Sequence, residues 1–247
     1  ANDTATASPK GPLTTAGTLS AGTGSPNYGY FAGRDPGSTR VDRIDYSNDT
    51  AAAASKGPLS TTRRSSYSFS GQENGLQTST TSPGSPILAP TQPPFLFPEQ
   101  LPNPQISGYF SGGEESPSGS LYSRFQRIDY TNDTATTSIR GPITGPVRGA
   151  LAGAGNNDYG WHAGGIYAIP SRTVYSKVDR IDYANDSSTA SPKGNLAAAR
   201  GYFNATGTLN YGYFAAGTPD GQFGPNSSTV QRIDYGNDTA ISSPKGP

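Results

Sequence analysis

Short segments in which apolar and polar residues alternate recur along the chain and predict β-strands. In the segment 41–46, Ile44 and Tyr46 fall on one face of an extended backbone, whereas Arg43 and Asp45 fall on the other. This alternation is typical of a half-buried strand. An Asn-Asp pair follows, and both residue types tolerate tight turns. The small side chains after the turn predict another strand, which a Lys-Gly-Pro triplet ends because proline has no backbone donor for a strand ladder.

An aromatic, glycine-rich segment precedes each alternating segment. Its first copy, residues 28–33, predicts a short strand whose glycines let neighbouring backbones approach closely. The stretch from Leu59 toward the next copy has room for a fourth strand. Four strands in about fifty residues match one blade of a β-propeller.

The same three modules are written several times. The module Arg-Ile-Asp-Tyr-x-Asn-Asp starts at Arg43, Arg127, Arg180 and Arg232, so successive starts lie 84, 53 and 52 residues apart. The aromatic-glycine module precedes each copy, and a module built around Lys-Gly-Pro follows. The 84-residue interval is read as two units, one of them degenerate: residues 66–71 fill the aromatic-glycine position, and residues 76–81 replace the alternating strand. Residues 83–105 are then a Pro-rich apolar insertion.

Two of these modules resemble kelch-type propeller repeats. The kelch pattern of a hydrophobic strand ending in paired glycines is similar to residues 110–113 and 163–165, and the kelch Tyr-Asp…Asn ending is similar to Ile-Asp-Tyr-x-Asn-Asp. The full wording of the modules is also similar to repeats of predicted structural proteins of aquatic phages. The resemblance implies a virion or fibre role by association alone.

These patterns predict an all-β fold in one domain, residues 1–247. We expect a five-bladed kelch-like β-propeller of four-stranded antiparallel blades, whose closure would remove exposed sheet edges. The alternative is an open array of β-repeats. Both termini carry the same module, so residues 237–247 are expected to be a spare terminal strand that pairs with a neighbouring subunit or continues into another domain. The other interpretation is a boundary inside a longer repeat array.

Composition narrows the classes of function. Lys and Arg total 18 and Asp and Glu total 18, so the net charge is zero and the basic footprint of a nucleic-acid binder is missing. The chain has no run of 18 apolar residues, so we expect no membrane span. It also has no cysteine, which excludes thiolate metal sites and a cysteine nucleophile.

Few residues qualify as catalytic or metal-binding. The single histidine, His162, stands where Phe31, Phe110 and Phe214 stand in sister units, so we interpret it as a packing residue. The repeated aspartates could suggest calcium, but they are too sparse within a unit to supply six to eight oxygen ligands. We therefore predict no catalytic residue, no metal and no cofactor.

The polar residues that recur in each copy of the repeat are expected to build the scaffold. We predict a same-face ion pair within each Arg-Ile-Asp motif, and turns held by the Asn-Asp pairs through side-chain to backbone hydrogen bonds. The residues so assigned are Arg43, Asp45, Asn48, Asp49, Arg127, Asp129, Asn132, Asp133, Arg180, Asp182, Asn185, Asp186, Arg232, Asp234, Asn237 and Asp238.

Positions that break the repeat are the candidates for interaction. Phe95, Leu96 and Phe97 lie between prolines in the insertion and would be costly to expose, so they are expected to dock on another chain or pack across the propeller. Trp161 replaces the tyrosine of its sister units, and His162 follows it. These five residues form the predicted interaction set.

The sequence therefore favours a non-enzymatic structural or assembly protein, located in a virion or outside the cell, whose partners are other protein subunits. The alternative is a propeller module that binds a surface glycan or a receptor. An enzyme acting on saccharide would need paired carboxylates, for which Glu114 and Glu115 are the best candidates.

Overall fold

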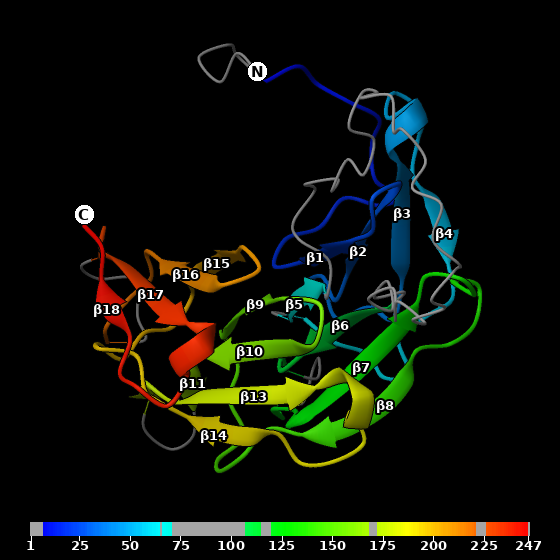
Figure 1. The fold of residues 1–247 in the computed structure, drawn as a ribbon. Helices are drawn as coiled ribbons and strands as arrows, with labels where there is room; N and C mark the ends of the chain where they lie inside the picture. The colour runs from blue at the N-terminus through cyan, green and yellow to red at the C-terminus, as the bar shows by residue number, and fades with distance from the viewer. Residues whose placement is uncertain are drawn as a thin grey trace, which may run out of the picture.

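The computed structural model describes residues 7–64, 66–70, 107–114, 120–167, 172–220 and 226–246. These residues form four antiparallel sheets of four strands each, arranged as propeller blades (Figure 1). Three short 3-10 helices, η1 (Tyr46–Asn48), η2 (Tyr183–Asn185) and η3 (Tyr235–Asn237), follow the third strands of blades 1, 3 and 4. The all-β propeller arrangement predicted from the repeats is confirmed.

Blade 1 consists of β1 (Ala21–Gly24), β2 (Tyr28–Ala32), β3 (Val41–Asp45) and β4 (Ala54–Lys56). Blade 2 consists of β5 (Tyr67–Ser70), β6 (Ser107–Ser111), β7 (Arg124–Asp129) and β8 (Ser138–Pro142). Blade 3 consists of β9 (Ala152–Gly155), β10 (Tyr159–Ala163), β13 (Val178–Asp182) and β14 (Ser191–Lys193). Blade 4 consists of β15 (Asn204–Gly207), β16 (Tyr211–Ala215), β17 (Val230–Asp234) and β18 (Ser243–Pro244). A hairpin of β11 (Ile166–Tyr167) and β12 (Thr173–Val174) lies between β10 and β13.

The described residues form four blades where five were expected. Residues 66–71 were predicted to open a degenerate unit, but their strand β5 pairs with the aromatic-glycine strand β6 of blade 2. It thus takes the place that β1, β9 and β15 take in the other blades. The long interval between modules is therefore explained by residues 71–106, which separate two strands of one hairpin. Residues 76–81 and the insertion 83–105 lie outside the described residues.

The first strands of successive blades are neighbours, in the order β1, β5, β9 and β15. No comparable contact joins β1 to β15 in the described residues, and Figure 1 shows blades 1 and 4 at the two ends of the arc. Residues 237–247 were expected to be a spare strand; of these, Ser243–Pro244 pair with β17 as β18 of blade 4. In the N-terminal copy of the module, residues 8–12 contribute no strand.

The hydrophobic core lies between adjacent blades. Phe69, Tyr109, Phe125 and Tyr183 fill the space between blades 2 and 3, and two similar clusters lie between the other neighbouring pairs. The glycines of the second strands make this packing possible: a Cβ on Gly160 would lie 2.1 Å from the Phe69 ring. Each blade therefore hides its aromatic residues against the next one, as the repeat predicted.

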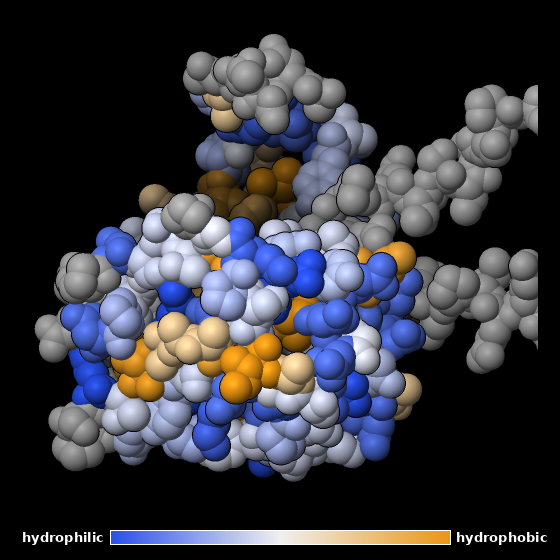
Figure 2. Space-filling model, turned by 60° about the vertical axis from the view of Figure 1, so that its left-hand side comes forward, coloured by the Kyte–Doolittle hydropathy of each residue, from blue (hydrophilic) through white to orange (hydrophobic). Residues whose placement is uncertain are grey.

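The face of the molecule seen in Figure 2 is mostly polar. Figure 2, in which the left-hand side of Figure 1 comes forward, shows apolar side chains gathered in a band between hydrophilic ones. The exposed large hydrophobic residues include Tyr202, Leu209 and Ile241 of the blade 4 region. No helix in the part of the chain that the structure describes has the length and apolar character needed to span a bilayer.

Candidate functional site

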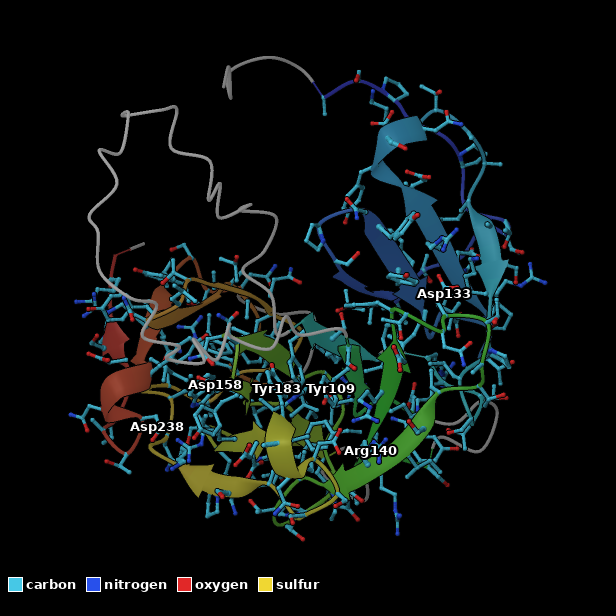
Figure 3. All side chains as sticks on the ribbon, turned by 45° about the vertical axis from the view of Figure 1, so that its right-hand side comes forward. Tyr109, Asp133, Arg140, Asp158, Tyr183 and Asp238 are labelled. Atoms are coloured by element: carbon cyan, nitrogen blue, oxygen red, sulfur yellow. The ribbon has the colours of Figure 1, made fainter. Side chains whose placement is uncertain are left out.

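The polar residues of the repeat converge at the contacts between blades. Between blades 2 and 3, the carboxylate of Asp186 accepts a hydrogen bond from the Tyr109 hydroxyl at 2.9 Å and from Arg127 Nη1 at 2.8 Å. Arg140 Nε lies 3.3 Å from the same carboxylate oxygen. Tyr109, Arg127 and Arg140 come from three neighbouring strands of blade 2, whereas Asp186 follows η2 of blade 3; Figure 3 labels Tyr109 and Arg140. We call this arrangement of three donors around one aspartate the joint.

The joint is built three times in the described residues. Asp133 accepts from Tyr30 Oη at 3.0 Å and Arg43 Nη1 at 2.7 Å, and Lys56 Nζ lies 3.3 Å away. The third copy surrounds Asp238 with Trp161 Nε1 at 3.0 Å, Arg180 Nη1 at 2.9 Å and Lys193 Nζ at 3.3 Å. The three aspartate side chains are only 7–8% exposed. A buried carboxylate needs such partners, because burial removes its water.

The backbone of the Lys-Gly-Pro module completes each joint. Gly141 N donates to Asp186 O at 2.9 Å, and Ala190 N donates to Pro142 O at 2.9 Å. A Cβ on Gly141 would lie 1.8 Å from the carbonyl oxygen of Ser188. The glycine is therefore required by close approach of the next blade.

The electrostatics of the joint keep its donors protonated. Burial, with the hydrogen bond to Asp133 and its negative charge as smaller causes, raises the pKa of the Tyr30 hydroxyl well above its usual value of 10. Burial and Asp186 act in the same direction on the pKa of Tyr109. These hydroxyls therefore serve as fixed hydrogen-bond donors and are unsuited to proton transfer near neutral pH.

The predicted ion pair within each Arg-Ile-Asp motif is wrong. Arg43 pairs with Asp133 of the next blade, and the salt bridges of the described residues include no pair between Arg43 and Asp45. Asp45 Oδ1 instead accepts from the backbone N and the hydroxyl of Ser47 at 2.9 and 2.6 Å, which caps η1. The same local capping is seen at Asp129, Asp182 and Asp234. Sharing a strand face did not decide the pairing, because the largely buried carboxylate of Asp133 on the next blade lies within reach of Arg43.

The predicted Asn-Asp turns have a mixed outcome. The turns form, but their hydrogen bonds are backbone to backbone: the main-chain carbonyls of Asn48, Asn132, Asn185 and Asn237 accept from the backbone N three residues later. The side-chain oxygens of Asn48, Asn132 and Asn237 accept from threonine hydroxyls instead of the predicted backbone groups. Their aspartate neighbours Asp133, Asp186 and Asp238 belong to joints, whereas the carboxylate of Asp49 forms a salt bridge only to Lys10 among the described residues, at 3.2 Å. The joint members that sequence reasoning missed are Tyr30, Tyr109, Lys56, Arg140 and Lys193, although each recurs at a fixed place in its module.

Trp161 and His162, two of the predicted interaction residues, are completely buried. Trp161 stacks on Tyr235 with ring centroids 3.7 Å apart, in addition to its hydrogen bond to Asp238. His162 lies against Phe69 and Phe125 at centroid distances of 4.3 and 4.6 Å, as expected of a packing residue. Neither side chain is accessible to a ligand. Phe95, Leu96 and Phe97 lie outside the described residues.

Two fully buried ion pairs lie apart from the joints. Arg34 binds Asp42 at 2.5 Å, and Arg148 binds Asp179. The matching positions of blades 2 and 4 hold Gln126 and Gln231, whose amides bond to backbone and hydroxyl groups. Blade 2 also buries Arg63 without a carboxylate; burial lowers its pKa to about 10, and Gly112 O accepts from it at 2.7 Å. Each of these side chains has at least one internal partner, so they belong to the packing of the blades.

The described residues contain no group of three His, Cys, Asp or Glu side chains placed to hold a metal ion. Glu114, one of the two carboxylates considered for a saccharide enzyme, lies 2.6 Å from Arg64 Nε. Glu115 lies outside the described residues. Comparison with models of known protein families gives no match. Comparison with curated protein sequences gives none either.

Proposed function

We propose that this protein is a non-enzymatic structural protein that acts by assembling with other protein subunits. The observation that supports the proposal is the use of the repeated charged residues: Asp133, Asp186 and Asp238 each bind donors from the neighbouring blade. Each unit thus buries its aromatic residues and its carboxylate only when another unit lies beside it. Modules with this dependence on their neighbours are suited to building extended assemblies.

The proposed location of the protein rests on the resemblance of its repeats. The modules resemble kelch-type propeller repeats and are similar to repeats of predicted structural proteins of aquatic phages. On that basis we propose a place in a virion or an extracellular fibre. The protein partners would be further copies or neighbouring structural proteins.

The test is to image the purified protein by negative stain and to measure its mass by light scattering over a range of concentrations. Regular particles or filaments are the expected result. Glycan-array binding by a protein that stays monomeric at every concentration would contradict the proposal and favour a glycan- or receptor-binding module. Trp161→Ala is unsuitable for separating these functions, because Trp161 is buried in a joint and its removal would damage the fold.

A further inference from the structure

The donor side of the joint occurs a fourth time, on blade 4. Tyr213 and Arg232 are paired across β16 and β17, as Tyr30 and Arg43 are paired across β2 and β3. Lys245 follows β18 as Lys56 ends β4, each two residues beyond the partner of its arginine. We call Tyr213, Arg232 and Lys245 the donor clamp of blade 4.

Arg232 of the donor clamp is stacked in the same way as the arginines of two occupied joints. The Arg232 guanidinium lies 4.3 Å from the Tyr211 ring centroid, which compares with 4.2 Å for Arg43 over Tyr28 and 4.1 Å for the matching pair of blade 3. This stacking fixes the cation without neutralising it. Among the described residues, neither Arg232 nor Lys245 forms a salt bridge, and Arg232 Nε is buried without a hydrogen-bond partner.

The acceptor side of the joint is incomplete on blade 1. Asp49 occupies the position of Asp133, but its side chain is 39% exposed and its salt bridge is to Lys10 alone. Lys10 is itself 48% exposed. Among the described residues, no tyrosine or arginine binds Asp49, whereas each complete joint has an aromatic donor, an arginine and a second cation. Of the four turn aspartates in the part of the chain that the structure describes, Asp49 is therefore the one without an aromatic donor and an arginine, the groups that blade 4 carries.

The glycines give a second, independent indication. Gly11, Gly57, Gly141 and Gly194 each have the backbone of the next turn within 1.8–2.0 Å of a Cβ position. Gly246, the fifth glycine of this module, has nothing within 4 Å and a φ of +118°. Among the described residues, no turn therefore occupies the surface beside Lys245.

We propose that the donor clamp of blade 4 binds the Asp49 turn of a second copy of this chain. This inference rests on the proposed assembly function and names its contact. The clamp and the turn are different surfaces, so the interface is head-to-tail and builds rings or filaments instead of closed pairs. Charge complementarity supports this occupant: two cations meet one exposed carboxylate.

Binding requires exchange with residues 8–12 of the receiving copy. That segment holds the Asp49 turn through Gly11 N to Asp49 O at 2.8 Å, Ala53 N to Pro12 O at 2.9 Å and the Lys10 salt bridge. Blade 4 offers the same Lys-Gly module and adds Tyr213 and Arg232. Blade 4 of the second copy therefore replaces the contacts of residues 8–12 with those of its own Lys-Gly module. It also supplies Tyr213 and Arg232, the two donors that the Asp49 turn lacks.

The experiment uses one donor variant and one acceptor variant in sedimentation velocity. Arg232→Ala removes one of the two cations of the clamp, and Asp49→Asn removes the carboxylate; each should weaken self-association by at least about thirtyfold. Mixed together, the two variants should form a 1:1 dimer and nothing larger, because one intact clamp and one intact turn remain. Deleting residues 1–12 should strengthen association, since the competing segment is gone. Lys177→Ala, which removes an exposed lysine distant from the clamp in sequence, is the matched control.

The outcomes separate the contact from the function. If the intact protein assembles and neither variant changes its association, the contact is wrong while an assembly role stands. Failure of the mixed variants to form a dimer would also overturn the head-to-tail contact. If the intact protein and the deletion variant both stay monomeric, the contact is overturned and the proposed self-assembly fails with it. Unchanged thermal melting of each variant excludes misfolding as the cause.

Discussion

Ser111 Oγ lies 2.8 Å from His162 Nδ1, so a buried hydrogen bond joins the second strands of blades 2 and 3. Both residues break the repeat at once: the matching strands carry Ala32 and Ala215 in place of Ser111, and Phe31 and Phe214 in place of His162. The other ring nitrogen, Nε2, is buried and has no partner among the described residues. The pair is thus a local polar substitution inside an aromatic core.

This environment predicts an acid-sensitive fold. Burial, with a smaller effect of Arg148, lowers the pKa of His162 from 6.5 to about 3. Below pH 6.5 the His162 imidazole binds a proton in the unfolded chain but stays neutral in the folded chain. The free energy of unfolding is therefore at its full value above pH 6.5 and decreases as the pH falls toward 3. The loss between pH 6.5 and pH 5 should be about 2 kcal/mol. Urea unfolding at both pH values measures it.

The matched variant is the double substitution Ser111→Ala with His162→Phe, which restores the residues of the sister strands. Its free energy of unfolding should lose most of this dependence on pH. If the double variant remains as acid-sensitive as the original protein, the titration belongs to another group.

The joints predict unequal effects for aspartates that occupy the same place in the repeat. Asp186→Asn leaves Arg127 and Arg140 without a counter-charge in a largely buried contact, so it should destabilise the fold by roughly 2–3 kcal/mol. Asp49→Asn removes only an exposed contact to Lys10 and should cost less than about 1 kcal/mol. Urea denaturation of the two variants provides the comparison, and equal losses would show that the joint does not stabilise the fold.

The sequence predicted the strands well because each strand is encoded locally. The alternation around Ile44 and the glycines of the aromatic segment decide strand type within a few residues. The side-chain pairs between blades could not be predicted from such local patterns. Arg43 and Asp133 lie 90 positions apart, and the pattern of one strand shows which side chains share a face but not which neighbour they meet.

The number of blades was missed for a related reason. Residues 67–70 carry Tyr and Phe in a position where β1, β9 and β15 carry small residues, so composition placed them in the aromatic-glycine module. Phe69 is aromatic because its ring packs against Gly160 of blade 3. That requirement comes from tertiary structure and is invisible in the segment itself.

Close approach in the joint predicts that one glycine tolerates no side chain. A Cβ on Gly141 would overlap the Ser188 carbonyl oxygen at 1.8 Å, so Gly141→Ala should cost roughly 3 kcal/mol and disrupt the hydrogen bond to Asp186 O. Gly236→Ala is the control: its nearest neighbour would lie at 3.4 Å, and η2 has Ala184 in the same place. Thermal melting should shift for the first variant only. Comparable melting of both would mean that the blades can separate without loss of stability.

Substitutions of Trp161 separate two contributions of the aromatic donor in a joint to stability, namely its packing and its hydrogen bond to the aspartate. Trp161→Tyr restores the residue of the sister blades and retains a donor for Asp238, so it should lose only packing against Tyr235, about 1–2 kcal/mol. Trp161→Phe loses the hydrogen-bond donor as well. It should lower the free energy of unfolding by about a further 1–2 kcal/mol, because Asp238 is buried and charged. Urea unfolding followed by circular dichroism measures both variants without relying on tryptophan emission. If the Phe variant is as stable as the Tyr variant, the hydrogen bond contributes nothing, and Arg180 with Lys193 neutralises Asp238 unaided.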